Sequence, residues 1–584
     1  MVYRRSIKVF LLVFAASLFS PIWNFASPQS ASPASPAVTP PAASNASHGI
    51  YLVFPFQNAG ASSRLDWLSE GLEELTIQAL SGAGEQVYSH AGRLGELERY
   101  GIPATAKLSR ATMLHVAEDL DADFVIFGSF NSDGKSLSID CRLLRVDPAS
   151  LLAPLHESGP LDSLMDLHTH LTWRLLSENN KAYPLNLAEF TKTHRPIRLD
   201  AFEHHIRGLI TNEDEPRLRE LREAARLEPE WSEPAYALGE TFFNRRDCAS
   251  ALPWFARVPK THDHYLEALF STGVCRLLTN QPEQAEESFA ALQTLLRTNA
   301  ASSVDFPEVL NNLAIARARQ NKFPAAQEDL KRASSLDPDE DDYPFNLGLI
   351  AVRQGDFAGA AVLFREASQR EPDIPEDRAL LIAALEKIGK KEEAEQERNT
   401  ATEAFGPNGV PVAHLDAHGD ALNHFERVMT EIDPETLRFE MESAEAHAAT
   451  SGSPDVDTPA SHLRRARQEL SAGRLDTAER EYRAALARDK GNAAAHLGLA
   501  DIARRQNKLD EAVKELLASL QTRDSAVVRT TLARVYLEQK KPALARTEAE
   551  KALMLAPNYS EARQLLEHLQ NGRPAAASPK GAPL

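Results

Sequence analysis

The stretch from Pro307 to Ile374 reads PEVLNNLAIARARQNKFPAAQEDLKRASSLDPDEDDYPFNLGLIAVRQGDFAGAAVLFREASQREPDI, and it repeats itself at a spacing of 34 residues. A fixed period of this length is typical of solenoids built from stacked helix pairs. Leu313-Ala314 recurs as Leu347-Gly348, and a small residue in the first helix lets the second approach closely. The other recurring positions are Ala326, Leu330, Ala333 and Pro338, which become Ala360, Phe364, Ala367 and Pro372. The proline cannot continue a helix and so separates one unit from the next.

The same period extends to both sides of this stretch and predicts a first helical array over residues 201–405. The gap between Gly273 and Ala314 is seven residues longer than the period, which places an insertion in the 298–306 loop. Residues 202–229 and 377–405 form less regular units, as expected where a stack ends. First helices are marked by Gly239, Gly273, Ala314 and Gly348, and second helices by Ala251, Ala285, Ala326 and Ala360.

A second array is predicted over residues 460–570. Its first helices are marked by Ala466, Ala500 and Ala533, and its second helices by Ala478, Ala512 and Ala545. Residues 406–459 interrupt the period, and the Ser, Gly, Pro and Asp residues near their end predict a flexible hinge. Within this hinge, residues 420–429 are predicted to be helical. Residues 571–584 are predicted to be a disordered tail.

At the repeated positions the sequence resembles the tetratricopeptide repeat (TPR) family. The resemblance implies a binding fold without catalytic residues, with a groove lined by fixed positions of each repeat. Those positions in the first array are Glu233, Tyr236, Glu240, Phe243, Glu267, Phe270, Glu308, Asn311, Asp342 and Phe345. In the second array they are Arg467, Arg504, Arg505 and Arg534, with Arg464 beside them. The acidic, aromatic groove suits a basic or apolar peptide, and the Arg-lined one suits carboxylates. Ordinary solvated helix faces are the alternative.

Charge differs between the two halves of the chain. The net charge is -19, and residues 461–584 carry 22 Lys and Arg against 15 Asp and Glu, a local excess of +7 that leaves -26 for residues 1–460. The two halves are therefore expected to prefer different partners. The arginines of the second array lack interleaved aromatic residues, and the chain is acidic overall, so a nucleic-acid partner is not expected.

Residues 48–180 have the pattern of a small α/β domain, followed by a linker over 181–200. Strands are predicted at 50–56, 124–130 and 137–146, the last two joined across Asp133-Gly134, which favours a tight hairpin. Helices are predicted at 65–80, 110–120 and 161–176. Three motifs, VFPFQN at 53–58, LDWLSEGL at 65–72 and ADFVIFGSF at 122–130, resemble the TolB amino-terminal-like domain. That resemblance implies a binding or assembly domain, in which Gly71 and Gly128 are structural.

The N-terminus resembles a bacterial export signal. Arg4, Arg5 and Lys8 precede an apolar run over 9–19, and small residues follow near Ala26. We therefore expect a signal peptide over 1–26, a disordered Pro/Ala/Ser linker over 27–47, and a location in the periplasm or cell envelope. An uncleaved anchor in the inner membrane through residues 9–26 is the alternative, and it would be the only membrane tether.

No motif predicts catalysis, a cofactor or a metal site. Residues 128–136 approach a P-loop, and 132–135 match SxxK, but both lie at a strand turn, whereas each motif needs a helix. His414 and His418, with Asp416, Asp420 and His424 nearby, fit a solvated linker better than a metal site. Cys141, Cys248 and Cys275 are predicted to be small buried hydrophobic residues, with a bridge between the last two as the alternative.

The sequence thus predicts an exported, non-catalytic scaffold of the bacterial cell envelope, which binds peptides or partner proteins in its TPR grooves. A ligand-sensing subunit is the alternative, in which the α/β domain binds a small molecule and the repeats relay the signal. No nucleophile with a base at motif spacing supports a hydrolase.

Overall fold

The computed structural model describes residues 49–432 and 459–569, with gaps at 61, 105, 121, 147–148, 181–182, 195, 300–304, 339, 407–408, 412, 414, 416–419, 472–473, 523, 556–558, 560–561, 564 and 567–568. The predicted signal peptide, Pro/Ala/Ser linker and C-terminal tail lie outside the described residues, and so do His414, Asp416 and His418. Among the described residues, no helix is long and apolar enough to cross a membrane.

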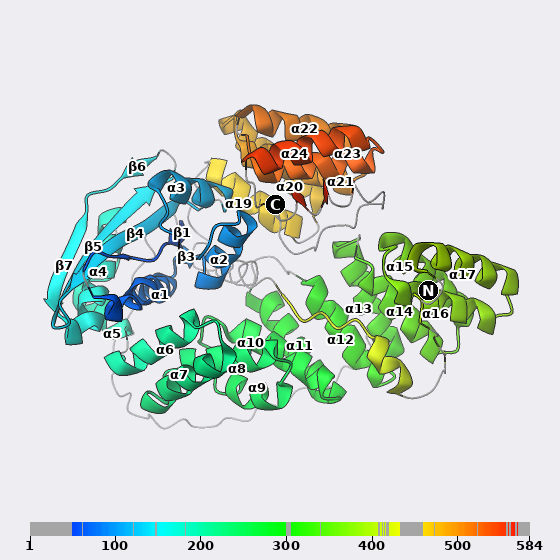
Figure 1. Cartoon of the computed structure of the whole chain (residues 1–584), viewed down its shortest axis with the longest axis horizontal. Coiled ribbons are helices and arrows are strands. Elements are labelled where there is room, and N and C mark those ends of the chain that lie inside the picture. Colours follow the sequence, from blue (N-terminus) through cyan, green and yellow to red (C-terminus); the bar gives the residue numbers. More distant parts are fainter. Residues whose placement is uncertain are drawn as a thin grey trace, which may run out of the picture. The chain divides into compact units, whose positions relative to one another are not determined.

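The N-terminal region is a mixed sheet covered by helices on both faces (Figure 1). The strand order is β3-β1-β4-β5-β6, with β2 paired to β4 and β7 paired to β5. β1 runs parallel to β3 and β4, while β4 and β5 form the antiparallel hairpin predicted across Asp133-Gly134. The strands are β1 (Ile50–Val53), β2 (Gln57–Asn58), β3 (Gln86–Val87), β4 (Phe124–Ser132), β5 (Ser136–Arg145), β6 (Ser150–Leu151) and β7 (Leu155–Pro160).

Alternating residues of β1 point to two separate buried clusters. Tyr51 and Val53 pack with α1 (Leu68–Ser81) and α4 (Leu164–Asn179), whereas Ile50 and Leu52 pack with α2 (His90–Arg99) and α3 (Arg110–Asp119). Each face of the sheet is therefore apolar, as the nearly continuous hydrophobic sequence of β1 requires. The first cluster continues into α6 (Leu199–Ile210) through Phe202.

The sequence predicted the main elements of this region but not all of them. The predicted first strand ends at Val53, before Pro55, and the predicted helix at 65–80 begins at Leu68. Helix α2 and strand β7 were not predicted, because their short sequences show no clear hydrophobic period. Gly128 is structural as expected: a Cβ atom there would collide with the Asp140 carbonyl and the Phe56 ring.

Two helical arrays follow, as the repeat period predicted. A short helix, α5 (Leu187–Thr193), precedes them within the predicted linker. The first array comprises α6, α7 (Asp214–Leu227), α8 (Glu233–Asn244), α9 (Cys248–Phe255), α10 (Tyr265–Leu278), α11 (Pro282–Asn299), α12 (Pro307–Arg319), α13 (Phe323–Leu336), α14 (Asp342–Arg353), α15 (Phe357–Arg370), α16 (Pro375–Lys387) and α17 (Lys391–Phe405). The second comprises α19 (Pro459–Ser471), α20 (Leu475–Arg488), α21 (Ala493–Arg505), α22 (Leu509–Thr522), α23 (Ala526–Glu538) and α24 (Pro542–Leu555).

The small residue of each first helix has the predicted packing role. A Cβ atom on Gly348 would lie 2.6 Å from the Phe364 ring of the paired helix, and one on Gly239 would lie 2.6 Å from Phe255. The turn between paired helices also repeats: Asn321 and Gly355, 34 residues apart, have φ of 60° and 76°. Glycine and asparagine tolerate this left-handed conformation best.

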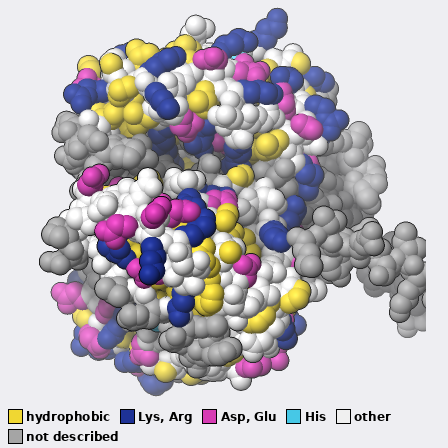
Figure 2. All heavy atoms as spheres, turned by 90° about the vertical axis from the view of Figure 1, so that its right-hand side faces the viewer, with side chains coloured by type: hydrophobic (Ala, Val, Ile, Leu, Met, Phe, Trp, Pro, Cys, Tyr) yellow, Lys and Arg dark blue, Asp and Glu magenta, His cyan; other side chains and the backbone are white. Residues whose placement is uncertain are grey.

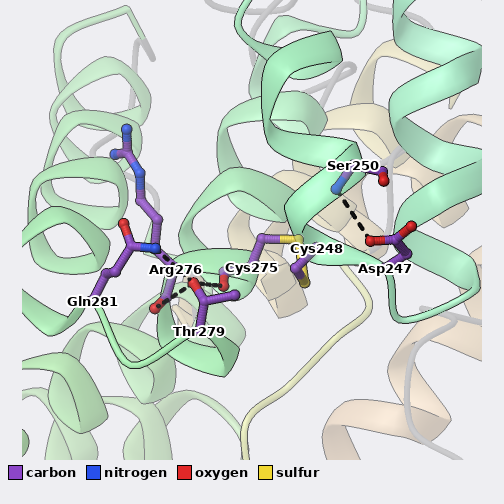
Figure 3. The surroundings of a disulfide bond; sticks show 7 residues. All are labelled: Asp247, Cys248, Ser250, Cys275, Arg276, Thr279 and Gln281. Atoms are coloured by element: carbon purple, nitrogen blue, oxygen red, sulfur yellow. Dashed lines mark hydrogen bonds between the residues drawn. A yellow bond between two sulfur atoms is a disulfide. The ribbon is translucent and has the colours of Figure 1, made fainter.

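Cys248 and Cys275 form a disulfide between α9 and α10, with their Cα atoms 5.0 Å apart (Figure 3). The prediction that both are unpaired hydrophobic residues is therefore wrong. Packing of consecutive repeats brings the two helices together, a proximity that a separation of 27 residues does not reveal. The bond joins well-defined helix ends, since Asp247 caps α9 through the Ser250 amide and Thr279 donates to the Cys275 carbonyl. Cys141 is buried and free, as predicted.

Candidate functional site: the first-helix face of the first array

A stretch of the chain beyond the first array lies on that array's own surface. Residues Asp420–Phe425 form a 3₁₀ helix, η3, and residues 426–432 continue without regular secondary structure. Figure 1 shows this stretch in yellow, crossing α12 and α13. We call residues 423–432 the internal segment, and the surface that α12, α14 and α16 present to it the first-helix face.

The internal segment runs opposite to the order of the repeats. Phe425 packs with the buried cluster of α14 to α17, Met429 with that of α12 to α14, and Ile432 with that of α10 to α12. Val428 joins Ile432 in the last cluster. The segment was predicted to be helical up to Met429 within a flexible hinge, but its helix ends at Phe425. It is held against the array because side chains of the first helices bind its backbone.

Two asparagines bind the backbone of the segment at alternate residues. Asn346 accepts from the Arg427 amide through Oδ1 at 3.0 Å and donates to the Arg427 carbonyl through Nδ2 at 3.1 Å. Asn312 does the same with Met429, at 2.9 Å and 2.7 Å. A side-chain amide thus replaces the neighbouring strand of a β-ladder, an arrangement that holds any extended chain whatever its side chains.

A third asparagine links these two. Asn311 donates to the Arg427 carbonyl at 2.8 Å, and its own Oδ1 accepts from Asn346 at 2.9 Å. Asn311 and Asn312 are fully buried and Asn346 nearly so. Buried amides must find hydrogen-bond partners, and here most of those partners belong to the internal segment. Without an extended chain in this place, the asparagines would need water in its stead.

Glu426 lies between two arginines. Arg319 contacts one carboxylate oxygen at 2.7 Å and Arg353 the other at 2.5 Å. The Glu426 side chain is 2% exposed and each arginine side chain 9% exposed, so these are buried, charge-assisted hydrogen bonds. Arg353 also donates to Asn423 Oδ1 at 2.7 Å.

Arg427 points into an acidic site on the same face. It forms ion pairs with Asp341, with Asp342 at 3.3 Å and with Asp377, and its guanidinium lies 3.7 Å from the centre of the Phe345 ring. Burial raises the pKa of Asp377 to about 7 although Arg427 opposes the shift. Removal of Arg427 would leave three carboxylates facing one another beside an aromatic ring. This site is therefore specific for a cation.

The structure assembles only part of the groove predicted for the first array. Asn311, Asp342 and Phe345 contact the internal segment as described. Phe270 is instead buried against Phe289, with ring centres 5.9 Å apart, and Phe243 packs against Phe255 at 6.4 Å. Glu308 is half-buried at the start of α12, and Glu240 is exposed.

Three other predicted residues, Glu233, Tyr236 and Glu267, belong to a histidine-rich cluster at the start of the array. Glu233 lies 3.0 Å from His262, Glu267 lies 3.2 Å from His264, and Tyr236 stacks on His264 with ring centres 4.4 Å apart. Burial alone would raise the pKa of Glu233, but the nearby histidines lower it to about 2. These carboxylates are thus already engaged by side chains of their own array.

Sequence reasoning missed six residues that hold the internal segment. They are Asn312, Asn346, Arg319, Arg353, Asp341 and Asp377. A signal for four of them is present: Asn312 and Asn346 are 34 residues apart, and so are Arg319 and Arg353. A polar residue that recurs with the repeat period on a first helix could have indicated a binding position.

The second array has a different surface at the corresponding positions. Arg505 pairs with Asp501 at 2.9 Å and Arg504 with Glu538 at 3.1 Å, while Arg467 and Arg534 are half-buried. The Arg464 side chain lies outside the described part. Arg504 and Arg505 thus already pair with acidic residues of the second array.

Two candidate sites in the α/β region are structural. Asp133 Oδ1 accepts from the backbone amides of Lys135 and Ser136 at 2.9 Å and 2.7 Å, which makes the P-loop-like stretch a hairpin turn, as expected. Glu70, Glu73 and His90 are close enough together to suggest a metal site. However, Arg93 lies beside them, 2.5 Å from Glu73 and 3.2 Å from Glu70, and supplies the positive charge itself.

Comparison with known proteins identifies the repeats. A model of the family described as tetratricopeptide repeat matches residues 311–375 and 463–527. No curated protein matches the chain. Among solved structures, MamA (41-end) from Desulfovibrio magneticus RS-1 is 25% identical with a TM-score of 0.27, covering 30% of this chain and 98% of that one.

Two further solved structures are also similar to part of the chain. YrrB, a TPR protein with an unusual peptide-binding site, is 13% identical with a TM-score of 0.26, covering 32% of this chain and 93% of its own. The LpoB C-terminal domain from Salmonella enterica is 14% identical with a TM-score of 0.17, and the match covers 20% of this chain and 87% of that domain.

The two matched ranges are of equal length and begin 152 residues apart. Adding 152 to a residue number in the first range therefore gives the corresponding residue of the second array. Asn312 and Asn346 then correspond to Arg464 and Gly498, so the second array lacks the asparagine pair. Both ranges nevertheless carry the family's pattern and fold into helix pairs. The chain therefore contains tetratricopeptide repeats in each of its two helical arrays.

Proposed function

We propose that this protein is an exported, non-catalytic scaffold of the bacterial cell envelope that binds extended protein segments on the first-helix face of its first TPR array. The observation that carries this proposal is the internal segment, whose backbone is bound by Asn312 and Asn346 at alternate residues. Side chains placed to bind a backbone in this way can hold a segment of another protein equally well.

The disulfide supports the exported location. Disulfides such as Cys248–Cys275 persist in oxidising compartments, among them the bacterial periplasm, and are rare in the reducing cytosol. The N-terminal sequence, with its basic residues followed by an apolar run, agrees with export through the inner membrane.

The second array has a separate role in this proposal. It carries the net positive charge and lacks the asparagine pair, so it does not bind the same segment. Its arginines, Arg464, Arg467, Arg504, Arg505 and Arg534, suit an acidic partner. The scaffold would then hold two different proteins.

Peptide binding in trans tests the proposal. The probe is a fluorescein-labelled peptide with the sequence of residues 422–433, LNHFERVMTEID. It is titrated into the full chain carrying Glu426→Ala and Arg427→Ala, which weaken the internal segment's hold on the face. Fluorescence anisotropy should show saturable binding that Asn312→Ala with Asn346→Ala removes. An anisotropy that stays flat, in a chain whose circular dichroism shows intact helices, rules the proposal out.

A further inference from the structure

We propose that the partner of the first-helix face is an extended protein segment that carries an adjacent Glu-Arg pair followed by apolar residues. We propose also that the internal segment occupies this face until such a partner displaces it. This inference rests on the proposed function and specifies its ligand. It is drawn from the contacts that the internal segment makes.

The partner's glutamate must come directly before its arginine, because the face has a basic site followed by an acidic one. The glutamate position lies between Arg319 and Arg353, whereas the next position lies among Asp341, Asp342 and Asp377. Exchange of the two residues would place an arginine against two arginines and a carboxylate against three carboxylates. Like charges brought together out of water repel each other strongly, so the face rejects the reversed order.

The register of the partner is set by its backbone. Asn346 holds the arginine position through both its amide and its carbonyl, and Asn312 holds the residue two places later. A shift of one residue would break these paired bonds and move both charges out of their sites. In this register, the two residues of the partner that follow its arginine take the places of Val428 and Met429. Both places adjoin buried apolar clusters, so apolar side chains fit there.

The internal segment competes because it belongs to the same chain. Attachment to the same chain raises the effective concentration of the segment at the face, so a free partner with the same contacts binds the wild-type chain more weakly than a chain whose segment has been released. The segment also lies in the sequence between the two arrays.

The experiment compares wild type with the chain that carries Glu426→Ala and Arg427→Ala, which we call the emptied chain. Two labelled peptides are used. One is LNHFERVMTEID, and the other is LNHFREVMTEID, in which only the Glu-Arg order is reversed. The emptied chain should bind the first peptide at least tenfold more tightly than wild type does, and at least tenfold more tightly than it binds the reversed peptide. The control is Glu431→Gln, an exposed position of the same segment that should bind as wild type.

Hydrogen exchange on the wild-type chain gives a second readout that needs no variant. Saturating unlabelled LNHFERVMTEID should expose the amides of Arg427 and Met429, which donate to Asn346 and Asn312, while α12 and α14 stay protected. Equal affinity of wild-type and emptied chains, or equal affinity for both peptides, overturns this inference but leaves the proposed function standing. Absence of peptide binding to the emptied chain removes both. Concentration-dependent dimers that exchange the segment would assign the face to a second copy and also overturn the inference.

Discussion

At the scale of single residues, the first-helix face shows how buried polar groups specify a partner. Asn346 uses both atoms of its amide on one residue of the internal segment, so its two roles cannot be met by a side chain that only accepts. Glu426 and Arg427, by contrast, are read by charge. Backbone and charge recognition act on neighbouring residues and reinforce each other.

Asn346→Asp should loosen the internal segment. The carboxylate keeps the acceptor for the Arg427 amide but loses the donors to the Arg427 carbonyl and to Asn311, and it adds a fourth acid beside Asp341, Asp342 and Asp377. We expect the free energy that holds the internal segment on the face to fall by about 2 to 3 kcal/mol. Hydrogen exchange of the Met429 amide would then be about 30- to 150-fold faster. Asn423→Asp is the matched control, since it can still accept from Arg353. Equal exchange in both variants would contradict the role of Asn346.

A buried histidine makes the α/β region sensitive to acid. His168 Nε2 lies 3.0 Å from Thr76 Oγ1, and Thr76 donates its own proton to the Leu72 carbonyl, so His168 must donate. Burial lowers the pKa of His168 to about 3, below its ordinary value of 6.5. The unfolded chain therefore binds more protons between these values, and stability falls as pH drops from about 6.5 towards 3.

His168→Gln should reduce the dependence of the unfolding free energy on pH. The glutamine amide can still donate to Thr76 but does not titrate, so on the order of 3 to 5 kcal/mol of acid-induced destabilisation should disappear. His170→Gln is the control, because His170 lies on the same helix but is only half-buried and pairs with Glu157. Urea unfolding of the full chain at several pH values, followed by tryptophan fluorescence, measures the effect. An unchanged pH profile in His168→Gln would refute it.

At the scale of elements, α9 is the shortest of the described helices in the first array. Helix α9 has 8 residues, whereas α13 and α15 have 14 each. It buries three apolar residues, Cys248, Ala251 and Phe255, whereas each of the other two helices buries four. The Cys248–Cys275 disulfide joins this short helix to α10 and offsets part of that deficit.

Cys248→Ser with Cys275→Ser should destabilise the first array. Closing a loop of 27 residues in the unfolded chain is worth about 3 to 4 kcal/mol in the chain-entropy view. Calorimetry should show that reductant lowers the melting temperature of wild type but not of the double variant. Cys141→Ala, which removes the buried free thiol, should respond to reductant as wild type does. If fully reduced wild type melts at its oxidised temperature, the bond does not stabilise the array.

At the scale of the whole molecule, the two arrays have separate cores. The buried clusters of α14 to α17 and of the second array share no residue. On the face that Figure 2 shows, acidic and basic side chains are interspersed. The two arrays can thus differ in partner while sharing a fold.

Ala360→Leu should separate the two arrays in a melting experiment. Ala360 is fully buried in α15, and a larger side chain there overpacks the helix interface at a cost of about 1 to 3 kcal/mol. The first array should melt earlier while the second keeps its midpoint. Val362→Leu, at a position 61% exposed in the same helix, should change neither. A common shift of both transitions would show that the arrays unfold as one unit.

The sequence by itself determined the helix pairs, the number of arrays and the main strands. Their causes are local: a small residue faces a large one 16 positions later, as Gly348 faces Phe364, and a proline ends the units at Pro338, Pro372 and Pro557. Fold class and TPR repeats were therefore predictable from spacing.

Only the tertiary structure decided what occupies the first-helix face. Asn346 meets Arg427 across 81 residues, and Asn312 meets Met429 across 117. Hydrogen bonds and ion pairs depend on proximity in space, and residues this far apart in a chain are brought together by folding, not by any period. For the same reason the Cys248–Cys275 disulfide was only the alternative prediction from the sequence. Sequence set the helices, and their packing brought Glu426 and Arg427 to the arginines and aspartates that bind them.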